Sequence, residues 1–221
     1  MLNNIKAVIF DLDGTLIDSM WVWHAVDDVY AEKYNIVKPD DFYEVMEGMS
    51  YTEVAQYFQD EFKLDMTVEE IKQEWLDMTI EMYRNEVELK EGVLLMLEHL
   101  KENGIKIGIA TSSSRELVEA VLSGRRVRHY FEAICTSCEV NAGKPEPDVY
   151  LKVASDLGVE AKDCLVFEDV AKGIMAGKNA GMKVSAIEDK GNVTQREYLR
   201  TLADYYIRTY KDVLEHTYEV L

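Results

Sequence analysis

The sequence predicts an α/β protein in which a parallel sheet, covered by helices on both faces, is interrupted by an all-helical insertion. Short apolar runs that can form strands alternate along the chain with segments whose apolar residues recur every three or four positions, as in helices. Between residues 19 and 83 this alternation stops, and only helical patterns follow one another. Alternating strands and helices are typical of a parallel sheet, because each parallel pair of strands needs a crossover connection.

The strands are predicted where short apolar runs stop at polar residues or glycine. The first run covers residues 7–10 and stops at Asp11, and the run over residues 106–110 stops at Thr111. Similar runs cover residues 133–135, 165–167 and 184–187, and a weaker one, expected at the edge of the sheet, covers residues 205–207. Continuous apolar runs of this length are typical of strands that are buried on both faces.

The helices are predicted between these strands, from apolar residues spaced three or four positions apart. They cover residues 92–103, 115–122, 148–157 and 171–180, and three of them are followed by a glycine that can end a helix. Inside the insertion, helices are predicted at residues 21–34, 51–62 and 68–83. We therefore expect an α/β core made of residues 1–18 and 84–221 and a helical domain made of residues 19–83.

The chain of 221 residues is strongly acidic, with 42 Asp and Glu residues against 24 Lys and Arg residues and a formal net charge of −18. The insertion holds sixteen acids and four bases, so it carries −12 of this charge, which we attribute to a solvated surface. Nucleic acids and anionic membranes are not expected as partners, because phosphate groups are bound by Lys and Arg. No apolar run approaches the roughly 18 residues of a membrane helix. We expect a cytoplasmic protein that is monomeric or weakly dimeric.

Two local features are expected to have no catalytic role. Cys135 and Cys138 form a C-x-x-C pattern, but they follow a strand-like run and do not lie at a helix N-terminus that would lower a thiol pKa. The basic residues Arg125, Arg126 and Arg128 are interpreted as part of an exposed loop that offsets nearby acids.

Polar residues that suit phosphate chemistry follow four of the predicted strands. They are Asp11 with Asp13, Thr111 with Ser112, Lys144, and Glu168 with Asp169. In open α/β sheets, ligands bind beyond the carboxyl ends of the strands, so we expect these side chains at one rim. Four carboxylates at one rim would repel one another or take up protons. A Mg²⁺ ion, which prefers oxygen ligands, would remove this conflict.

Four segments, in the right order along the whole chain, resemble the signatures of the haloacid dehalogenase-like (HAD) superfamily. The segment FDLDGTL at residues 10–16 resembles the first signature, and Thr111 after an apolar strand resembles the second. Lys144 in the segment GKPEPD is similar to the third, and Phe167-Glu168-Asp169 to the fourth. The resemblance implies a Rossmann-like parallel core, with the insertion as a helical cap over the active site.

The resemblance also implies a phosphatase mechanism, with Mg²⁺ as the cofactor and a small phosphorylated metabolite as the substrate. Asp11 would be the nucleophile that forms an aspartyl-phosphate, and Asp13 would be the general acid and base. Thr111 would donate a hydrogen bond to a phosphoryl oxygen, and Lys144 would neutralise charge. The implied metal ligands are Asp11, Asp13 through its backbone carbonyl, Asp169, and Glu168 through water.

The subgroup that the chain resembles contains β-phosphoglucomutase as well as phosphatases of phosphoglycolate, sugar phosphates and nucleoside phosphates. The mutase has a Lys and an Arg in a cap motif, whereas the matching positions here are Glu47 and Tyr51. A mutase needs cap cations for a distal phosphate, so a phosphatase is favoured and a phosphomutase is the alternative. Ser112, Trp23 and Tyr51 are expected to contact the substrate. A third hypothesis, an inactive HAD-like binding module, is disfavoured by the complete set of signature acids.

Overall fold

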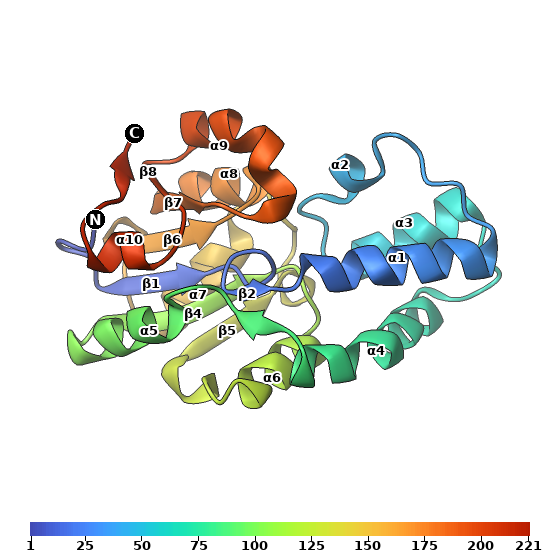
Figure 1. Ribbon diagram of the computed structural model, residues 1–221, viewed down its shortest axis with the longest axis horizontal. Coiled ribbons are helices and arrows are strands. Elements are labelled where there is room, and N and C mark those ends of the chain that lie inside the picture. The colour runs from blue at the N-terminus through green and yellow to red at the C-terminus, as the bar shows by residue number, and fades with distance from the viewer.

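The fold is built on one seven-stranded sheet, shown in the computed structural model of Figure 1, which describes residues 1–221 except for the side chain of Asn192. Six strands are parallel, and the last strand pairs antiparallel at one edge. In spatial order the strands are β5 (Ala133–Thr136), β4 (Lys106–Thr111), β1 (Ala7–Phe10), β6 (Cys164–Glu168), β7 (Lys183–Ile187), β8 (Tyr205–Ile207) and β9 (Glu219–Val220). Because β1 lies between β4 and β6, the residues that follow these three strands meet at one rim.

Helices cover both faces of the sheet, because successive strand residues point apolar side chains to opposite faces. Val8 and Phe10 of β1 belong to one core, and Ala7 and Ile9 belong to the other. The helices over the first face are α5 (Val93–Glu102), α6 (Arg115–Gly124) and α10 (Lys211–Leu214). Those over the second face are α7 (Asp148–Leu157), α8 (Ala171–Asn179) and α9 (Arg196–Leu202). Short 3₁₀ helices lie at Arg128–Tyr130, Ser137–Glu139, Ala161–Asp163 and Lys190–Gln195.

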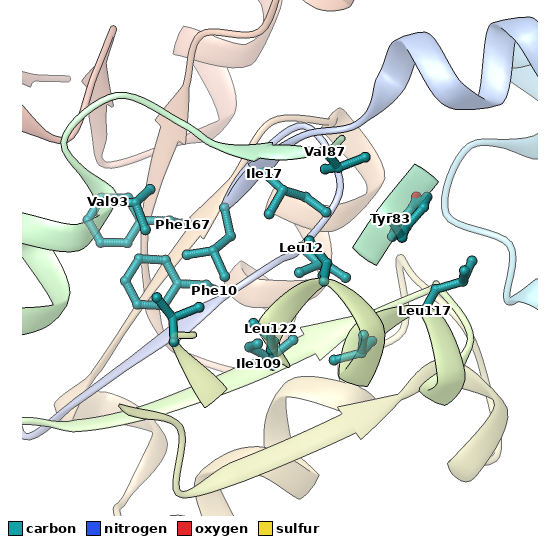
Figure 2. Close-up of a cluster of buried hydrophobic side chains, with 14 of the residues drawn as sticks. Phe10, Leu12, Ile17, Tyr83, Val87, Val93, Ile109, Leu117, Leu122 and Phe167 are labelled. Atoms are coloured by element: carbon teal, nitrogen blue, oxygen red, sulfur yellow. The ribbon is translucent and has the colours of Figure 1, made fainter. Parts of the chain in front are cut away.

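The first core lies beneath the site and continues into the interior of the cap. Figure 2 shows Phe10 and Phe167 of neighbouring strands beside one another, with Leu12 and Tyr83 nearer the cap. The Phe10 and Phe167 rings stack, with centroids 5.4 Å apart. This packing fixes the ends of β1 and β6, from which the acidic side chains of the site extend.

Four helices form a cap between β1 and β4 along the chain. They are α1 (Met20–Tyr34), α2 (Phe42–Met46), α3 (Tyr51–Phe62) and α4 (Val68–Asn85). Figure 1 shows them at one end of the molecule, with both chain termini at the opposite end. Capping boxes start two of these helices, Ser50 with Glu53 at α3 and Thr67 with Glu70 at α4. The chain enters and leaves the cap through a short antiparallel pair, β2 (Ile17–Asp18) and β3 (Glu88–Leu89).

The predicted fold class, a parallel α/β core with a helical cap, is confirmed. The predicted strands and helices agree with the observed bounds to within two residues, and α4 extends to Asn85 instead of residue 83. The sequence did not predict α2, α9, β9 or the β2–β3 pair. These elements have two to seven residues, too few to show a periodic pattern. The sequence predicts β8 at the edge of the sheet, but the edge strand in the structure is β9.

Two of the basic residues outside the site pair with acids, and one of the two thiols of the C-x-x-C pattern is buried. Arg125 forms an ion pair with Glu88, and Nε of Arg128 lies 2.9 Å from a carboxylate oxygen of Glu119. Burial raises the pKa of Cys135 to about 11, so this side chain stays a thiol at neutral pH. In the part of the chain that the structure describes, no helix has both the length and the apolar character needed to cross a membrane.

Candidate active site

Asp11 is the first residue after β1 and lies at the carboxyl end of the sheet. Its backbone N–H donates a hydrogen bond of 3.0 Å to the carbonyl oxygen of Phe167 in β6, which joins the two strand ends. Gly14 follows in the same loop with φ of +78°, and a Cβ atom at this position would overlap the carboxylate of Asp169. Glycine adopts this backbone conformation without strain and leaves the space that Asp169 occupies.

Lys144 is buried between two carboxylates. Its Nζ donates to Oδ1 of Asp11 at 2.6 Å and to Oε1 of Glu168. Burial disfavours the charged ammonium, but the two carboxylates outweigh this effect and raise the pKa of Lys144. Burial also raises the pKa of Asp11, and the charges of Glu168 and Asp169 add to the rise, while Lys144 opposes it. Lys144 is thus the group that favours a charged Asp11.

Glu168 is held in place by four hydrogen-bond donors. Its Oε1 accepts from Lys144 and, at 2.9 Å, from the hydroxyl of Tyr150 in α7. Its Oε2 accepts from the backbone N–H groups of the next two residues, at 2.9 and 3.2 Å. Tyr150 was not found by the sequence analysis, because a tyrosine at an apolar helix position is expected simply to pack in the core. In the structure it helps Glu168 to orient Lys144.

Three buried carboxylates suit a divalent cation. Asp11, Glu168 and Asp169 each offer one oxygen atom, and these atoms lie within 4.8 Å of one another. Burial, together with repulsion from Glu168, raises the pKa of Asp169 to about 8, although the Thr15 hydroxyl donates to its Oδ1 at 2.7 Å. One lysine does not balance three acids, so a cation that takes carboxylate oxygens, such as Mg²⁺, fits these residues.

Asp13 accepts hydrogen bonds from residues at the beginning and at the end of the cap segment. Its Oδ1 accepts hydrogen bonds from Ser19 Oγ, at 2.6 Å, and from the hydroxyl of Tyr83 near the end of α4. Burial raises the pKa of Asp13, and the hydrogen bonds from Ser19 and Tyr83 oppose the rise. A raised pKa keeps a proton available, as a general acid requires. A serine before a helix would be read as an N-cap, but the Ser19 side chain makes no capping bond and instead binds Asp13.

Thr111 and Ser112 lie at the end of β4. Thr111 is buried, and its Oγ1 accepts a hydrogen bond of 3.0 Å from the backbone N–H of Ser113, so its hydroxyl proton remains to be donated. The carbonyl oxygen of Ser112 accepts a bond of 3.0 Å from the backbone N–H of Tyr51, the first residue of α3. The core and the cap are therefore in direct contact beside the site.

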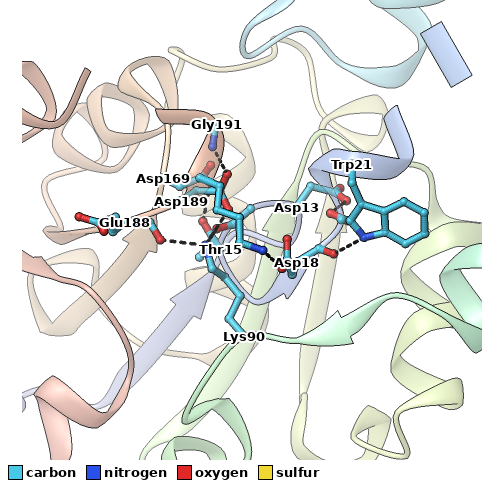
Figure 3. A network of polar contacts seen from close by, with 12 residues as sticks. Asp13, Thr15, Asp18, Trp21, Lys90, Asp169, Glu188, Asp189 and Gly191 are labelled. Atoms are coloured by element: carbon cyan, nitrogen blue, oxygen red, sulfur yellow. Dashed lines mark hydrogen bonds and ion pairs between the residues drawn. The ribbon is translucent and has the colours of Figure 1, made fainter. Parts of the chain in front are cut away.

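A second lysine, Lys90, stabilises the loop that carries Gly14. Its Nζ donates to the carbonyl oxygens of Gly14 and Glu188, at 2.5 and 2.9 Å, and to Oδ2 of Asp189 at 2.8 Å. Figure 3 shows Lys90 beside Thr15 and Asp189, between the loop after β1 and the loop after β7. Lys90 directly follows β3, so it connects the return from the cap to the site. The sequence analysis missed Lys90 and Asp189 because neither residue lies in a motif.

A cavity of about 410 Å³ lies between the core and the cap. The predicted site residues that line it are Asp11, Asp13, Trp23, Tyr51, Thr111, Ser112, Lys144 and Asp169. Glu168 is fully buried and does not line the cavity, but it contacts three residues that do, Lys144, Asp169 and Val170. Trp21 does not line the cavity, and its indole N–H donates to the carbonyl oxygen of Asp18 at 2.9 Å (Figure 3). The structure thus brings the predicted residues together at one place.

Comparisons with known proteins agree with this site. Residues 8–187 match the model of the haloacid dehalogenase-like hydrolases. The bifunctional riboflavin kinase/FMN phosphatase of Arabidopsis thaliana is 32% identical over 220 residues, which cover 96% of this chain but only 56% of that protein, about half of its length. A Drosophila melanogaster protein named "Probable pseudouridine-5'-phosphatase" is 30% identical over 216 residues, or 93% of each chain. The structure of β-phosphoglucomutase from Clostridium difficile has the same fold, with a TM-score of 0.79 and 22% identity over 96% of each chain.

The chain belongs to the haloacid dehalogenase-like hydrolase family. Within that family, the acidic site and the similar phosphatases identify it as a HAD-type phosphatase, a phosphoric monoester hydrolase that acts on phosphorylated small metabolites.

Proposed function

We propose that this protein is a Mg²⁺-dependent phosphatase that hydrolyses a small phosphomonoester, of the sugar, nucleoside or glycolate phosphate type, through an aspartyl-phosphate on Asp11. The observation that carries the proposal is the 2.6 Å contact between Asp11 and Lys144 in a cavity that Asp13 also lines. A carboxylate nucleophile, a buried cation and a proton donor are the groups that this chemistry needs.

The reaction has two steps on the same pair of acids. A carboxylate oxygen of Asp11 attacks the phosphorus atom, and the bond from phosphorus to the leaving oxygen breaks. Asp13 gives its proton to that oxygen, and the alcohol leaves. Asp13, now ionised, takes a proton from a water molecule that attacks the aspartyl-phosphate. Inorganic phosphate is released, and both acids return to their starting states.

The other site residues bind and orient the phosphoryl group. Thr111 donates its hydroxyl proton to a phosphoryl oxygen, and Lys144 balances the charge of Asp11 and of the transferred group. Asp11, Asp169 and the backbone carbonyl of Asp13 would hold Mg²⁺, with Glu168 acting through water, and the bound ion would supply positive charge that allows two anions to approach. Glu168 mainly orients Lys144, because both of its oxygens already accept hydrogen bonds.

A substrate with a single phosphate fits this cavity better than a bisphosphate. Among the described residues that line it, Lys144 is the only Lys or Arg, and Lys144 belongs to the reacting phosphate. Glu47 and Tyr51 stand where a mutase has cations, which favours a phosphatase over a phosphomutase. Two similar proteins are named for FMN and for pseudouridine 5′-phosphate, both compounds with one phosphate.

The test is release of inorganic phosphate from a panel of sugar, nucleoside and glycolate phosphates, with Mg²⁺ and with EDTA. We expect Asp11→Asn to abolish turnover, Asp13→Asn to lower kcat at least about 100-fold, and EDTA to remove activity. Asp156→Asn is the control, because Asp156 forms an exposed ion pair with Lys152 and does not line the cavity. Near-normal phosphate release by either active-site variant would contradict the scheme.

Other outcomes separate the alternatives. Formation of glucose 6-phosphate from β-glucose 1-phosphate with little free phosphate would favour a phosphomutase. Absence of Mg²⁺-dependent hydrolysis of every phosphomonoester would favour an inactive binding module. The cytoplasmic location and the monomeric state stay predictions, and size-exclusion chromatography with light scattering tests the second.

A further inference from the structure

The cap wall of the cavity is aromatic. Its aromatic residues are Trp23, Tyr43, Tyr51, Phe58 and Trp75. Tyr51 lies edge-on to both Trp23 and Trp75, with ring centroids 6.1 and 5.7 Å away. Aromatic rings prefer offset or edge-to-face contacts with another ring, so this wall suits a flat apolar group on the leaving alcohol. The cavity of about 410 Å³ falls within the size range of small-molecule sites.

Three acids of the cap line the same cavity, and their surroundings differ. Glu44 is exposed, and Glu47 already accepts a hydrogen bond of 2.9 Å from the backbone N–H of Lys172. Asp27 of α1 is partly buried beside the aromatic wall. Among these three acids, Asp27 is therefore the one placed to meet a group that enters the aromatic part of the cavity.

The groups around Asp27 leave it able to accept a further hydrogen bond. The Tyr43 hydroxyl, which lies 3.0 Å from Nδ1 of His24, is close enough to Asp27 to lower its pKa. Burial raises the pKa of Asp27 to about 7, and Asp28 adds to the rise while Lys38 opposes it. A carboxyl group has two oxygens with several acceptor positions, more than one tyrosine uses. A half-buried carboxyl is stabilised when a ligand donor fills such a position.

From this arrangement we propose that Asp27 determines specificity: it accepts a hydrogen bond from a ring N–H of a flat heterocyclic leaving group that packs against Trp23 and Tyr51. The substrates would then be nucleoside-type monophosphates. The inference rests on the proposed function, because the phosphate end of the same cavity must be the reacting site. A sugar phosphate without a flat nitrogen heterocycle would leave the aromatic wall uncovered. A bisphosphate would find no Lys or Arg for its second phosphate among the described cap residues that line the cavity.

The test compares kcat/KM for two phosphomonoesters that contain a ring N–H, uridine 5′-monophosphate and FMN, with kcat/KM for ribose 5-phosphate, which has no nitrogen heterocycle. We expect at least one ring substrate to exceed ribose 5-phosphate by about tenfold or more. Asp27→Leu should remove most of this preference, because it deletes the acceptor but keeps the volume, and Asp27→Asn should have a smaller effect. For ribose 5-phosphate, which offers no ring N–H, kcat/KM should fall less in either variant than it does for the ring substrate.

Glu32→Leu is the matched control. Glu32 is an exposed acid on the same helix as Asp27, and it does not line the cavity. The readout is the ratio of kcat/KM for two substrates, measured on one protein preparation. Partial loss of folded protein lowers both values equally and therefore leaves the ratio unchanged. A wild-type enzyme that prefers ribose 5-phosphate, or an Asp27→Leu variant with an unchanged ratio, would overturn the inference. If the enzyme hydrolysed none of these compounds and no p-nitrophenyl phosphate either, that result would instead contradict the proposed function.

Discussion

The Nζ atom of Lys144 lies 2.6 Å from Oδ1 of Asp11, although 133 positions separate the two residues in the sequence. Lys144 is only 6% exposed, and its second carboxylate partner, Glu168, is fully buried. One ammonium group is thus enclosed by two acids in a place that water barely reaches. This ion pair favours the charged form of Asp11 against the burial that raises its pKa.

Replacing Lys144 with methionine should therefore damage both catalysis and stability. Two buried carboxylates would lose their cation, so we expect kcat to fall at least about 100-fold. Without Mg²⁺, the free energy of unfolding should fall by about 3–5 kcal/mol. Phosphate release and urea unfolding in EDTA measure the two effects. Lys152→Met, which breaks an exposed ion pair with Asp156, should change neither by much. Full activity in Lys144→Met would exclude Lys144 from the mechanism.

Alanine at Gly14 should disturb the metal site, whereas alanine at Gly104 should not. Both glycines have positive φ, +78° and +67°, so alanine strains the backbone at either position by about 1 kcal/mol. Only at position 14 would the new Cβ overlap a carboxylate, that of Asp169, while nothing lies near position 104. We expect Gly14→Ala to lose most activity and the stabilisation by Mg²⁺, and Gly104→Ala to lose only stability. Equal activities of the two variants would show that the space beside Asp169 is unimportant.

The parts of the fold that the sequence predicted are those whose signal is local. The strands β1, β4 and β6 are continuous apolar runs, and the acids and Thr111 follow them directly along the chain. A parallel sheet then brings these ends to one rim whatever the details of packing. For this reason the sequence alone was enough to predict the layered core, the helical cap and the motif residues that lie at this rim.

The contacts that the sequence missed are made between distant segments. Ser19, just before the first cap helix, and Tyr83, near the end of the last cap helix, both donate hydrogen bonds to Asp13. Tyr150 donates to Glu168 from α7, on the second face of the sheet. Lys90 bonds to Asp189 across 99 positions. Each of these residues has an ordinary local explanation, as a cap, a core aromatic or a surface charge. Only the tertiary structure shows that their polar atoms point at the site.

The raised pKa of Asp169 predicts how the metal-free protein responds to pH. An unfolded Asp has a pKa of about 3.9, and in the folded protein the pKa of Asp169 is about 8. Between these values the folded state binds more protons, so its stability falls as the pH rises. Asp169→Asn removes this titration. In EDTA the variant should therefore be more stable than the wild type at pH 8, and the difference should shrink toward pH 4.

Thermal unfolding between pH 4 and pH 8 tests this expectation, with EDTA and then with Mg²⁺. The ion should raise the Tm of the wild type at pH 8, because it replaces the protons that relieve the buried acids, and it should not raise the Tm of Asp169→Asn. The Thr15 hydroxyl can still donate to an Asn oxygen at position 169, so the variant keeps its local hydrogen bond. Parallel pH curves for the two proteins in EDTA would refute the raised pKa.

Glu47 should hold the cap against the core. Its Oε1 accepts the backbone N–H of Lys172 at 2.9 Å, in the first turn of α8, where Val170 offers no capping side chain. A carboxylate at a helix N-terminus pairs with an otherwise unpaired N–H and with the helix dipole. Glu47→Ala should therefore favour an open cap and raise KM by up to about tenfold, with a smaller effect on kcat. Glu47→Gln keeps an acceptor oxygen, so its KM should lie between the KM of the wild type and that of Glu47→Ala.

Glu44→Ala is the control, because the Lys172 side chain approaches only the backbone oxygen of Glu44, which alanine retains. If Glu47→Ala and Glu44→Ala gave the same KM, the bond to α8 would have no part in closing the cap.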